Sequence, residues 1–327
     1  MRHGEFGYGH ASISPIPWRN AWAFTCVCLL VCGINLAQAG AQEILIVSSS
    51  GAKPYEEAHM ALLEALVRQG HKARSVRLDQ LSKVDLEKLR QEQPQAVVAL
   101  GSGTARTLDG VLPKQVPLVF CMVADDASLD LDRSRPVAGV EMLVPLKKQL
   151  DLISQTLPRA RKVGMLYRSG DTQSAHVVEQ LKAELPAGWS LEAVAVDQHS
   201  SFAKALDALL KTRPDIVWTS PDAEIFNSTT IRALLLEALR CKVPVFGFSP
   251  AFVRSGALLG VGIDPSTQGV QAAALVHALA GADVKSVPRA AQEPRFSVAV
   301  NLVVAEKLEL EMPREIVNAA SEVIGKP

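Results

Sequence analysis

Short apolar runs alternate with segments of helical periodicity along most of the chain, and this alternation limits the folds that it can adopt. The first series of apolar runs lies at 43–48, 95–100 and 116–123. The second series follows residue 141 and lies at 162–167, 190–196, 215–219 and 243–248. Strands that are apolar throughout, with helices between them, form parallel sheets covered on both faces. The sequence therefore predicts an α/β protein with two doubly wound parallel-sheet lobes.

The predicted helices carry their apolar residues on one face and end near helix-stopping residues. They are expected at 56–69, 146–156, 173–185, 201–211 and 225–240, and a further helix is expected to begin at Gly103-Thr104.

Length and charge narrow the class of protein further. The 327 residues are too many for one small core, and they fit two domains of ~100–150 residues each. The formal net charge is +0. This charge argues against a nucleic-acid-binding protein, which needs a basic face, and against a polybasic membrane adaptor.

The N-terminal segment favours export. An apolar run at 21–36 ends in Ala37-Gln38-Ala39, which is a signal-peptidase cleavage pattern. The run is shorter than the about 20 residues that a membrane-spanning helix needs. We therefore expect a signal peptide at 1–39, cut after Ala39 or Ala41, and localisation in the periplasm. An uncleaved N-terminal anchor is the alternative.

The loops that follow the apolar runs supply the candidate ligand-binding residues, because open parallel sheets bind ligands at the carboxyl ends of their strands. These loops are small, hydroxylated and sparsely charged. Hydroxyl and backbone N–H groups suit a carboxylate or polar head group, and Asp125 or Asp222 suits an ammonium. For each serine, helix N-capping is the alternative role. The predicted ligand-binding residues are Ser48, Ser49, Ser50, Ser102, Gly103, Thr104, Asp125, Ser169, Thr172, Gln173, Ser174, Asp222 and Ser249.

Motifs for nucleotide binding and for hydrolysis are missing. The chain has neither G-x-x-x-x-G-K-[ST] nor G-x-G-x-x-G. The stretch Gly247-Phe248-Ser249-Pro250-Ala251 differs from a nucleophile elbow, because Pro250 lacks the backbone N–H that the oxyanion hole requires. We therefore predict neither an enzyme nor a cofactor.

Cysteine and histidine spacing predicts no metal site. Only Cys121 and Cys241 remain after removal of the expected signal peptide. We expect both to be buried free thiols, and a bridge or metal pair is the alternative. No two histidines lie four residues apart with a glutamate between them.

Several segments resemble one known family. These are VPLVFCMVADD at 116–126, VAGVEMLVPLKKQLDLISQTL at 137–157, KVGMLY at 162–167, VPVF at 243–246, SGAL at 255–258 and GID at 262–264. Their order and spacing are similar to those of the substrate-binding proteins of ABC transporters, which include tryptophan- and tyrosine-type binding proteins with the type I periplasmic-binding-protein fold. The similarity extends over essentially the whole exported chain.

The resemblance implies two lobes joined by three crossovers, with a ligand held in the cleft between them. The first lobe would comprise 42–141 and about 260–290, and the second would comprise 142–259 and about 291–327. The resemblance also implies hinge closure around a small molecule. In such a closed form, we expect Ser102, Thr104 and nearby N–H groups to bind a carboxylate.

Some positions depart from the family pattern. The family's Thr-Asp-Pro after the fourth strand is replaced by Ala124-Asp125-Asp126, and its Asp-Asn pair by Asp222-Ala223. Glu309 stands where a glycine is customary. These changes leave the expected fold untouched, but they prevent transfer of the ligand.

Two functions follow as expectations. The first is an exported receptor that captures a small polar, amino-acid-like molecule and delivers it to an ABC permease. The alternative is a periplasmic sensory or assembly module with the same fold and a divergent or empty cleft, which would signal to a membrane sensor kinase or join an envelope complex.

Overall fold

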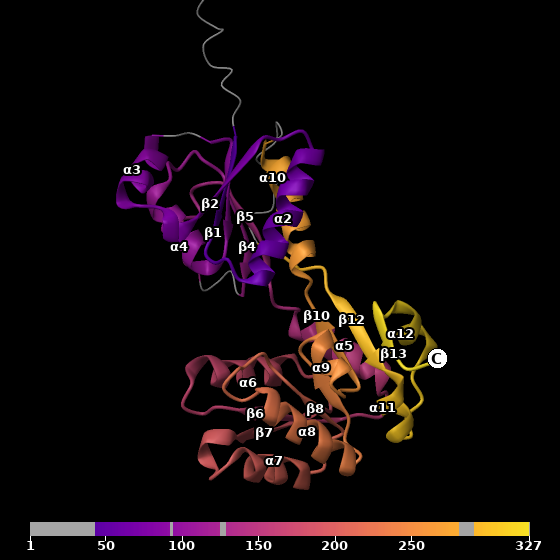
Figure 1. Cartoon of the computed structure of the whole chain (residues 1–327). Helices are drawn as coiled ribbons and strands as arrows, with labels where there is room; N and C mark the ends of the chain where they lie inside the picture. Colours follow the sequence, from indigo (N-terminus) through magenta and orange to yellow (C-terminus); the bar gives the residue numbers. More distant parts are fainter. Residues whose placement is uncertain (1–42, 92–93, 125–128, 281–290, 327) are drawn as a thin grey trace, which may run out of the picture. The chain divides into compact units, whose positions relative to one another are not determined.

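The structure is a computed structural model that describes residues 43–326 except 92–93, 125–128 and 281–290 (Figure 1). The expected signal peptide at 1–39 and the candidate residue Asp125 therefore lie outside the described residues. Among the helices of the described residues, none combines the length and apolar character needed to cross a membrane.

The first sheet has six strands in the order β11-β5-β4-β3-β1-β2, and its neighbouring strands are parallel. The strands are β1 (Ile44–Ser48), β2 (Ala73–Arg77), β3 (Ala96–Leu100), β4 (Leu118–Val123), β5 (Val137–Glu141) and β11 (Ala291–Gln292). The helices that accompany them are α2 (Lys53–Arg68), α3 (Lys83–Gln91), α4 (Ser102–Val111) and α10 (Pro265–Ala280).

The second sheet has seven strands in the order β13-β12-β10-β9-β8-β6-β7. They are β6 (Lys162–Tyr167), β7 (Ser190–Ala195), β8 (Ile216–Trp218), β9 (Val245–Gly247), β10 (Leu259–Gly262), β12 (Ser297–Asn301) and β13 (Glu322–Ile324). Its helices are α5 (Leu146–Thr156), α6 (Thr172–Glu184), α7 (Phe202–Lys211), α8 (Ser228–Arg240), α9 (Pro250–Arg254), α11 (Leu302–Lys307) and α12 (Arg314–Ala319). The predicted class, with two parallel-sheet lobes, is confirmed, and one pair of neighbours departs from it because β12 pairs antiparallel with β10.

Each sheet buries both of its faces along its inner strands, which explains why strands such as β1, β3 and β4 are apolar throughout. Along β1, Ile44 and Ile46 pack in one cluster with residues of α2 and α10. The alternate residues Leu45 and Val47 pack in a second cluster with residues of α3 and α4. Figure 1 shows these two helix pairs on opposite faces of the first sheet. The second sheet is covered in the same way, by α5 and α6 on one face and by α7 and α8 on the other.

The chain passes between the two sheets three times. The first passage follows β5 and the second follows β10, whose pairing with β9 and β12 places residues 259–262 in the second sheet. The third passage follows β11, which pairs with β5 in the first sheet.

Helices α2 and α10 pack against each other in the first lobe with their backbones in close contact. A Cβ atom added at Gly269 of α10 would lie 2.1 Å from the carbonyl oxygen of Ala58 in α2. Such a distance is far below van der Waals contact, so only glycine allows the two backbones to approach this closely.

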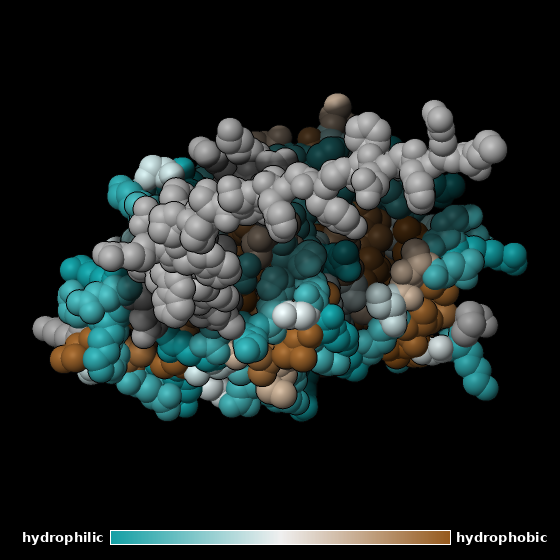
Figure 2. Space-filling view, turned by 90° about the horizontal axis from the view of Figure 1, so that it is seen from above, coloured by the Kyte–Doolittle hydropathy of each residue, from teal (hydrophilic) through white to brown (hydrophobic). Residues whose placement is uncertain are grey.

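The surface has no single large apolar area on the face that Figure 2 shows, where hydrophobic side chains lie in separate areas between hydrophilic ones. Large apolar side chains that are exposed among the described residues include Met60, Val67, Leu236 and Val303. They belong to three different helices, α2, α8 and α11, and scattered exposed apolar side chains are ordinary for a protein surface.

Candidate functional site

The carboxyl ends of β1 and β3 lie side by side in the first sheet and bring two predicted loops together. The backbone N–H of Ser49 donates to the carbonyl oxygen of Leu100 at 3.0 Å. Gly101 follows with φ 101° and ψ 150°, a backbone conformation that is essentially restricted to glycine. A Cβ atom at Gly101 would lie 2.5 Å from Ser49 Oγ. Gly101 therefore permits both the turn into α4 and the approach of Ser49.

Helix α4 begins at this point without a side-chain cap, because its N-cap residue is Gly101. The first hydrogen bond of the turn is from the N–H of Ala105 to the carbonyl oxygen of Gly101 at 3.0 Å. The N–H groups of Ser102, Gly103 and Thr104 precede it, and among the described residues no acceptor meets them. Free N–H groups at a helix N-terminus favour an anionic ligand.

The hydroxyl groups predicted at this edge have different surroundings. Ser48 Oγ donates to the carbonyl oxygen of Ser50 at 2.9 Å, and Ser50 Oγ accepts from the N–H of Ala52 at 3.0 Å. These two side chains hold their own loop. Ser49 and Ser102 are half-buried, and their hydroxyls form no hydrogen bond with the described residues, so they remain available to a ligand.

Thr104 is fully buried, and its Oγ1 atom has no hydrogen-bond partner among the described residues. The N–H of Thr104, which belongs to the open first turn of α4, therefore suits a carboxylate better than its hydroxyl does. Buried polar atoms without a partner are uncommon in folded proteins.

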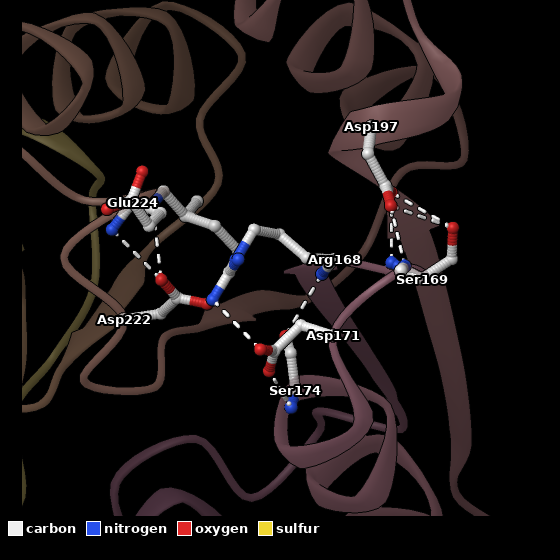
Figure 3. Close-up of polar contacts among 9 residues, drawn as sticks. Arg168, Ser169, Asp171, Ser174, Asp197, Asp222 and Glu224 are labelled. Carbon is white, nitrogen blue, oxygen red and sulfur yellow. Dashed lines mark hydrogen bonds and ion pairs between the residues drawn. The ribbon is translucent and has the colours of Figure 1, made fainter.

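A charged cluster lies at the carboxyl ends of β6, β7 and β8 in the second sheet (Figure 3). Arg168 directly follows β6, and its Nε donates to Asp222 Oδ2 at 3.0 Å. Arg168 Nη2 lies 3.4 Å from Asp171 Oδ2. The Arg168 side chain is 33% exposed and that of Asp222 is 10% exposed. Mainly because of the Asp222 hydrogen bond, the pKa of Arg168 lies above its ordinary value.

Asp222 has both carboxylate oxygens engaged. Oδ1 accepts from the N–H of Glu224 at 3.0 Å, and Oδ2 accepts from Arg168. A ligand ammonium, which the sequence suggests for Asp222, would therefore have to compete with the guanidinium of Arg168 for this carboxylate.

Asp197, in the 3-10 turn Val196–Gln198 that follows β7, organises the loop after β6. Its Oδ1 accepts from the N–H of Ser169 at 2.9 Å, and its Oδ2 accepts from the N–H of Gly170 at 2.7 Å. The Ser169 hydroxyl also donates to it at 3.0 Å. These backbone N–H groups, Ser169 first, lower the pKa of Asp197. The predicted residue Ser169 thus points toward Asp197 in Figure 3.

Other predicted residues of the second lobe have capping or surface positions. Ser174 is buried, its N–H donates to Asp171 Oδ1 at 2.7 Å, and its Oγ accepts from the N–H of Arg168 at 3.0 Å. Ser249 caps α9 by accepting from the N–H of Phe252 at 3.3 Å, so the capping alternative describes this residue. Thr172 and Gln173 are exposed at the start of α6.

Arg168, Asp171 and Asp197 are not among the ligand-binding residues predicted from the sequence. Arg168 carried a usable signal, because it is a charged residue placed directly after a buried strand. Asp197 carried none, because its contact with Ser169 joins residues 28 positions apart and depends on the pairing of β6 with β7.

Both remaining cysteines are free, as expected, but only one is buried. Burial raises the pKa of the Cys121 thiol to about 12, so this thiol stays protonated. The expectation of burial is wrong for Cys241, which is exposed at the end of α8. No group of three or more potential metal ligands occurs among the described residues.

A surface groove of about 880 Å³ lies at the opposite edge of the second sheet. The turns that lead into β6, β8 and β9 line it, and so does the segment that follows α11. Lys242 bridges part of this edge by donating to the carbonyl oxygen of Lys307 at 2.7 Å and to Glu309 at 2.8 Å. Since parallel sheets bind ligands at their carboxyl edge, we place the candidate site at the carboxyl ends of the strands instead.

Comparison with protein families decides which class this architecture belongs to. Residues 65–324 match the model of the family described as ABC transporter substrate binding protein. The chain belongs to this ABC transporter substrate-binding family. The resemblance seen in the sequence is therefore confirmed, and the members of the family are binding proteins rather than enzymes.

One relative of this chain is a tyrosine-binding protein of Clostridioides difficile (strain R20291), with 25% identity over 182 residues. The match covers 54% of this chain and 52% of that protein, so the chain spans about half the length of this relative.

Solved structures of similar fold cover most of the chain. The ligand-free, open structure of a substrate-binding protein with adhesive properties from Clostridium difficile has a TM-score of 0.69 and 18% identity, and it covers 87% of this chain and 100% of that one. The structure of an ABC domain in complex with L-Trp from Streptococcus pneumonia has a TM-score of 0.56 and 21% identity, with 86% and 99% covered. At these identities the similarity establishes the fold, which is that of the type I periplasmic binding proteins.

Proposed function

We propose that the chain is an exported solute receptor that captures a small polar molecule between its two lobes and delivers it to an ABC permease. The observation that carries the proposal is the open N-terminus of α4, which offers free N–H groups beside Ser49 and Ser102 in a member of a substrate-binding family. These groups suit a carboxylate, so the proposed ligand is an organic acid, and the amino acids are one class of such acids.

Binding would favour closure of the lobes. A ligand that contacts both lobes has a higher affinity for the closed form, and it shifts the equilibrium between open and closed forms only by that difference in affinity. The residues proposed to line the first lobe are Ser49, Ser102, Gly103 and the N–H of Thr104, together with Asp125. Those proposed for the second lobe are Asp222 and the loop 168–174.

Export to the periplasm is part of the same proposal. The pattern at 21–39 supports a signal peptide, so the mature chain should begin at Gly40 or Gln42. A receptor in that compartment can meet both a solute from outside the cell and a permease in the membrane.

A thermal-shift screen of the purified chain tests the proposed function. The panel consists of amino acids, the corresponding 2-hydroxy acids, their primary amides and neutral sugars. A ligand present at 100 times its Kd raises the free energy of unfolding by about 2.7 kcal/mol, which corresponds to a Tm increase of about 4–5 °C in a chain of this size.

The expected result is that at least one acid raises the Tm and that its primary amide, which lacks the carboxylate charge, raises it much less. If neutral sugars raise the Tm and no acid does, the carboxylate site is wrong. If no compound raises the Tm, a sensory or assembly module with an empty cleft is favoured over a receptor.

A further inference from the structure

We propose that Arg168 determines which ligands the second lobe accepts, because its N–H groups donate to an uncharged oxygen of the ligand. Without Arg168, the lobe would present the carboxylate of Asp222 to a ligand ammonium. The inference rests on the proposed function and refines its ligand class. The receptor would select organic acids whose second polar group is a hydroxyl or carbonyl, in preference to the matching amino acids.

The first step of the argument is that Asp222 is not free to bind a cation. One oxygen accepts from the N–H of Glu224 and the other from Arg168 Nε, and the side chain is only 10% exposed. A ligand ammonium could reach Asp222 only by displacing the guanidinium, which holds the carboxylate with a charge-assisted hydrogen bond.

The second step is that Arg168 is held in place with one edge open. Asp222 binds Nε and Asp171 lies beside Nη2, while Nη1 forms no hydrogen bond with the described residues. Both aspartates also have fixed positions, because Asp171 caps α6 and Asp222 accepts from the backbone after β8. A guanidinium fixed in this way presents its remaining N–H groups with little loss of conformational freedom on binding.

The third step concerns the other donors of the second lobe. Side-chain caps engage part of the first turn of three helices there: Asp171 accepts from the N–H of Ser174 in α6, Asn227 caps α8 and Ser249 caps α9. The N-terminus of α4 in the first lobe has no side-chain cap. Arg168 therefore adds a charged side-chain donor to the carboxyl edge of the second lobe, whereas the first lobe offers the backbone N–H groups of an uncapped helix.

The charge of the cluster selects an uncharged partner for Arg168. The carboxylates of Asp171, Asp222 and Glu224 outnumber the guanidinium and give the cluster a net negative charge, which repels a second anionic group of the ligand. In direct contact with Arg168, an ammonium is disfavoured as well, because it has the same charge as the guanidinium and no lone pair to accept from its N–H groups. A hydroxyl or carbonyl oxygen accepts from the guanidinium without either penalty.

The test is isothermal titration of the purified full chain with matched pairs of acids. Suitable pairs are L-phenylalanine with L-phenyllactate, L-leucine with L-2-hydroxyisocaproate and L-glutamate with L-2-hydroxyglutarate. Each pair is measured with the wild-type chain, with Arg168→Gln and with the control Arg213→Gln. Arg213 is an exposed arginine at the opposite edge of the same lobe. Circular dichroism confirms that each variant is folded.

The wild-type chain is expected to bind the hydroxy acid of at least one pair at least tenfold more tightly than the amino acid. Arg168→Gln frees Asp222 for an ammonium, so it should lower this preference at least tenfold, while Arg213→Gln should leave it unchanged. Tighter binding of the amino acid by the wild type, or an unchanged preference in Arg168→Gln, overturns the inference and leaves the proposed function standing. Failure of every acid in the panel to bind contradicts the proposed function itself.

Discussion

At the scale of single residues, Asp197 shows how one carboxylate can shape a loop at the candidate site. It accepts hydrogen bonds from the N–H groups of Ser169 and Gly170, and these bonds lower its pKa in the folded state. A carboxyl group whose pKa is lower in the folded chain contributes stability above its unfolded pKa of about 4. This contribution is lost as the pH falls through the folded pKa.

The corresponding prediction is a pH-dependent effect of Asp197→Asn. The variant should have a lower Tm than the wild type at pH 7, and the gap should narrow at pH 3, which lies below the unfolded pKa of about 4, because the stability from the lowered pKa is lost as the pH falls toward the folded pKa. Thermal melts at the two pH values measure this. The control Asp207→Asn removes an exposed pair with Lys211, whose small effect should vanish in 1 M salt because screening weakens surface ion pairs. An equal gap at pH 7 and pH 3 for Asp197→Asn would count against the assignment.

The roles of single residues are also where the sequence was least informative. The sequence placed Ser169 and Ser249 at the carboxyl edge of the sheet, but it could not tell a ligand-facing hydroxyl from a capping one. Ser249 accepts from its own helix and Ser169 donates to Asp197. These choices depend on distances between loops, which a pattern along the chain does not contain.

At the scale of elements, the packing of α2 against α10 ties the returning segment of the chain to the first lobe. Gly269 meets the backbone of Ala58 with no room for a side chain. Gly110 in α4 has open space around its Cβ position and an ordinary negative φ. Both glycines are helical, so substitutions at the two positions separate the effect of close backbone contact on the free energy of unfolding from the effect of helix propensity.

We expect Gly269→Ala to lower the free energy of unfolding by roughly 1–3 kcal/mol, because the added methyl group forces the helices apart. Gly110→Ala should raise it by roughly 0.5–1 kcal/mol, because alanine loses less conformational entropy in a helix. Urea unfolding monitored by circular dichroism measures both. Equal effects of the two substitutions would mean that α2 and α10 are not in close contact.

Elements with strong apolar patterns could be predicted, and those without them could not. The strands β1, β3, β4 and β6 are continuous apolar runs because both faces of each are buried. Strand β2 (ARSVR) escaped prediction because it lies at the edge of the sheet and is only half-buried. The antiparallel pairing of β12 with β10 has no counterpart in composition, because the direction of this strand follows from the third passage of the chain between the sheets.

At the scale of the whole molecule, the alternation of apolar runs and helical segments was enough to predict two parallel-sheet lobes. The family resemblance added the order of the passages between them. The two lobes then differ in the chemistry of their carboxyl edges: the first has an open helix N-terminus at α4, and the second has capped helices and the Arg168 cluster. This difference supports a ligand with two unlike polar ends.

The central claim, that the chain captures a small molecule, is tested most directly by native mass spectrometry of the chain purified from its natural compartment without refolding. If the chain is a receptor, we expect a one-to-one adduct whose mass corresponds to a small organic acid. An adduct-free mass that persists after the protein is soaked in a metabolite extract would contradict it.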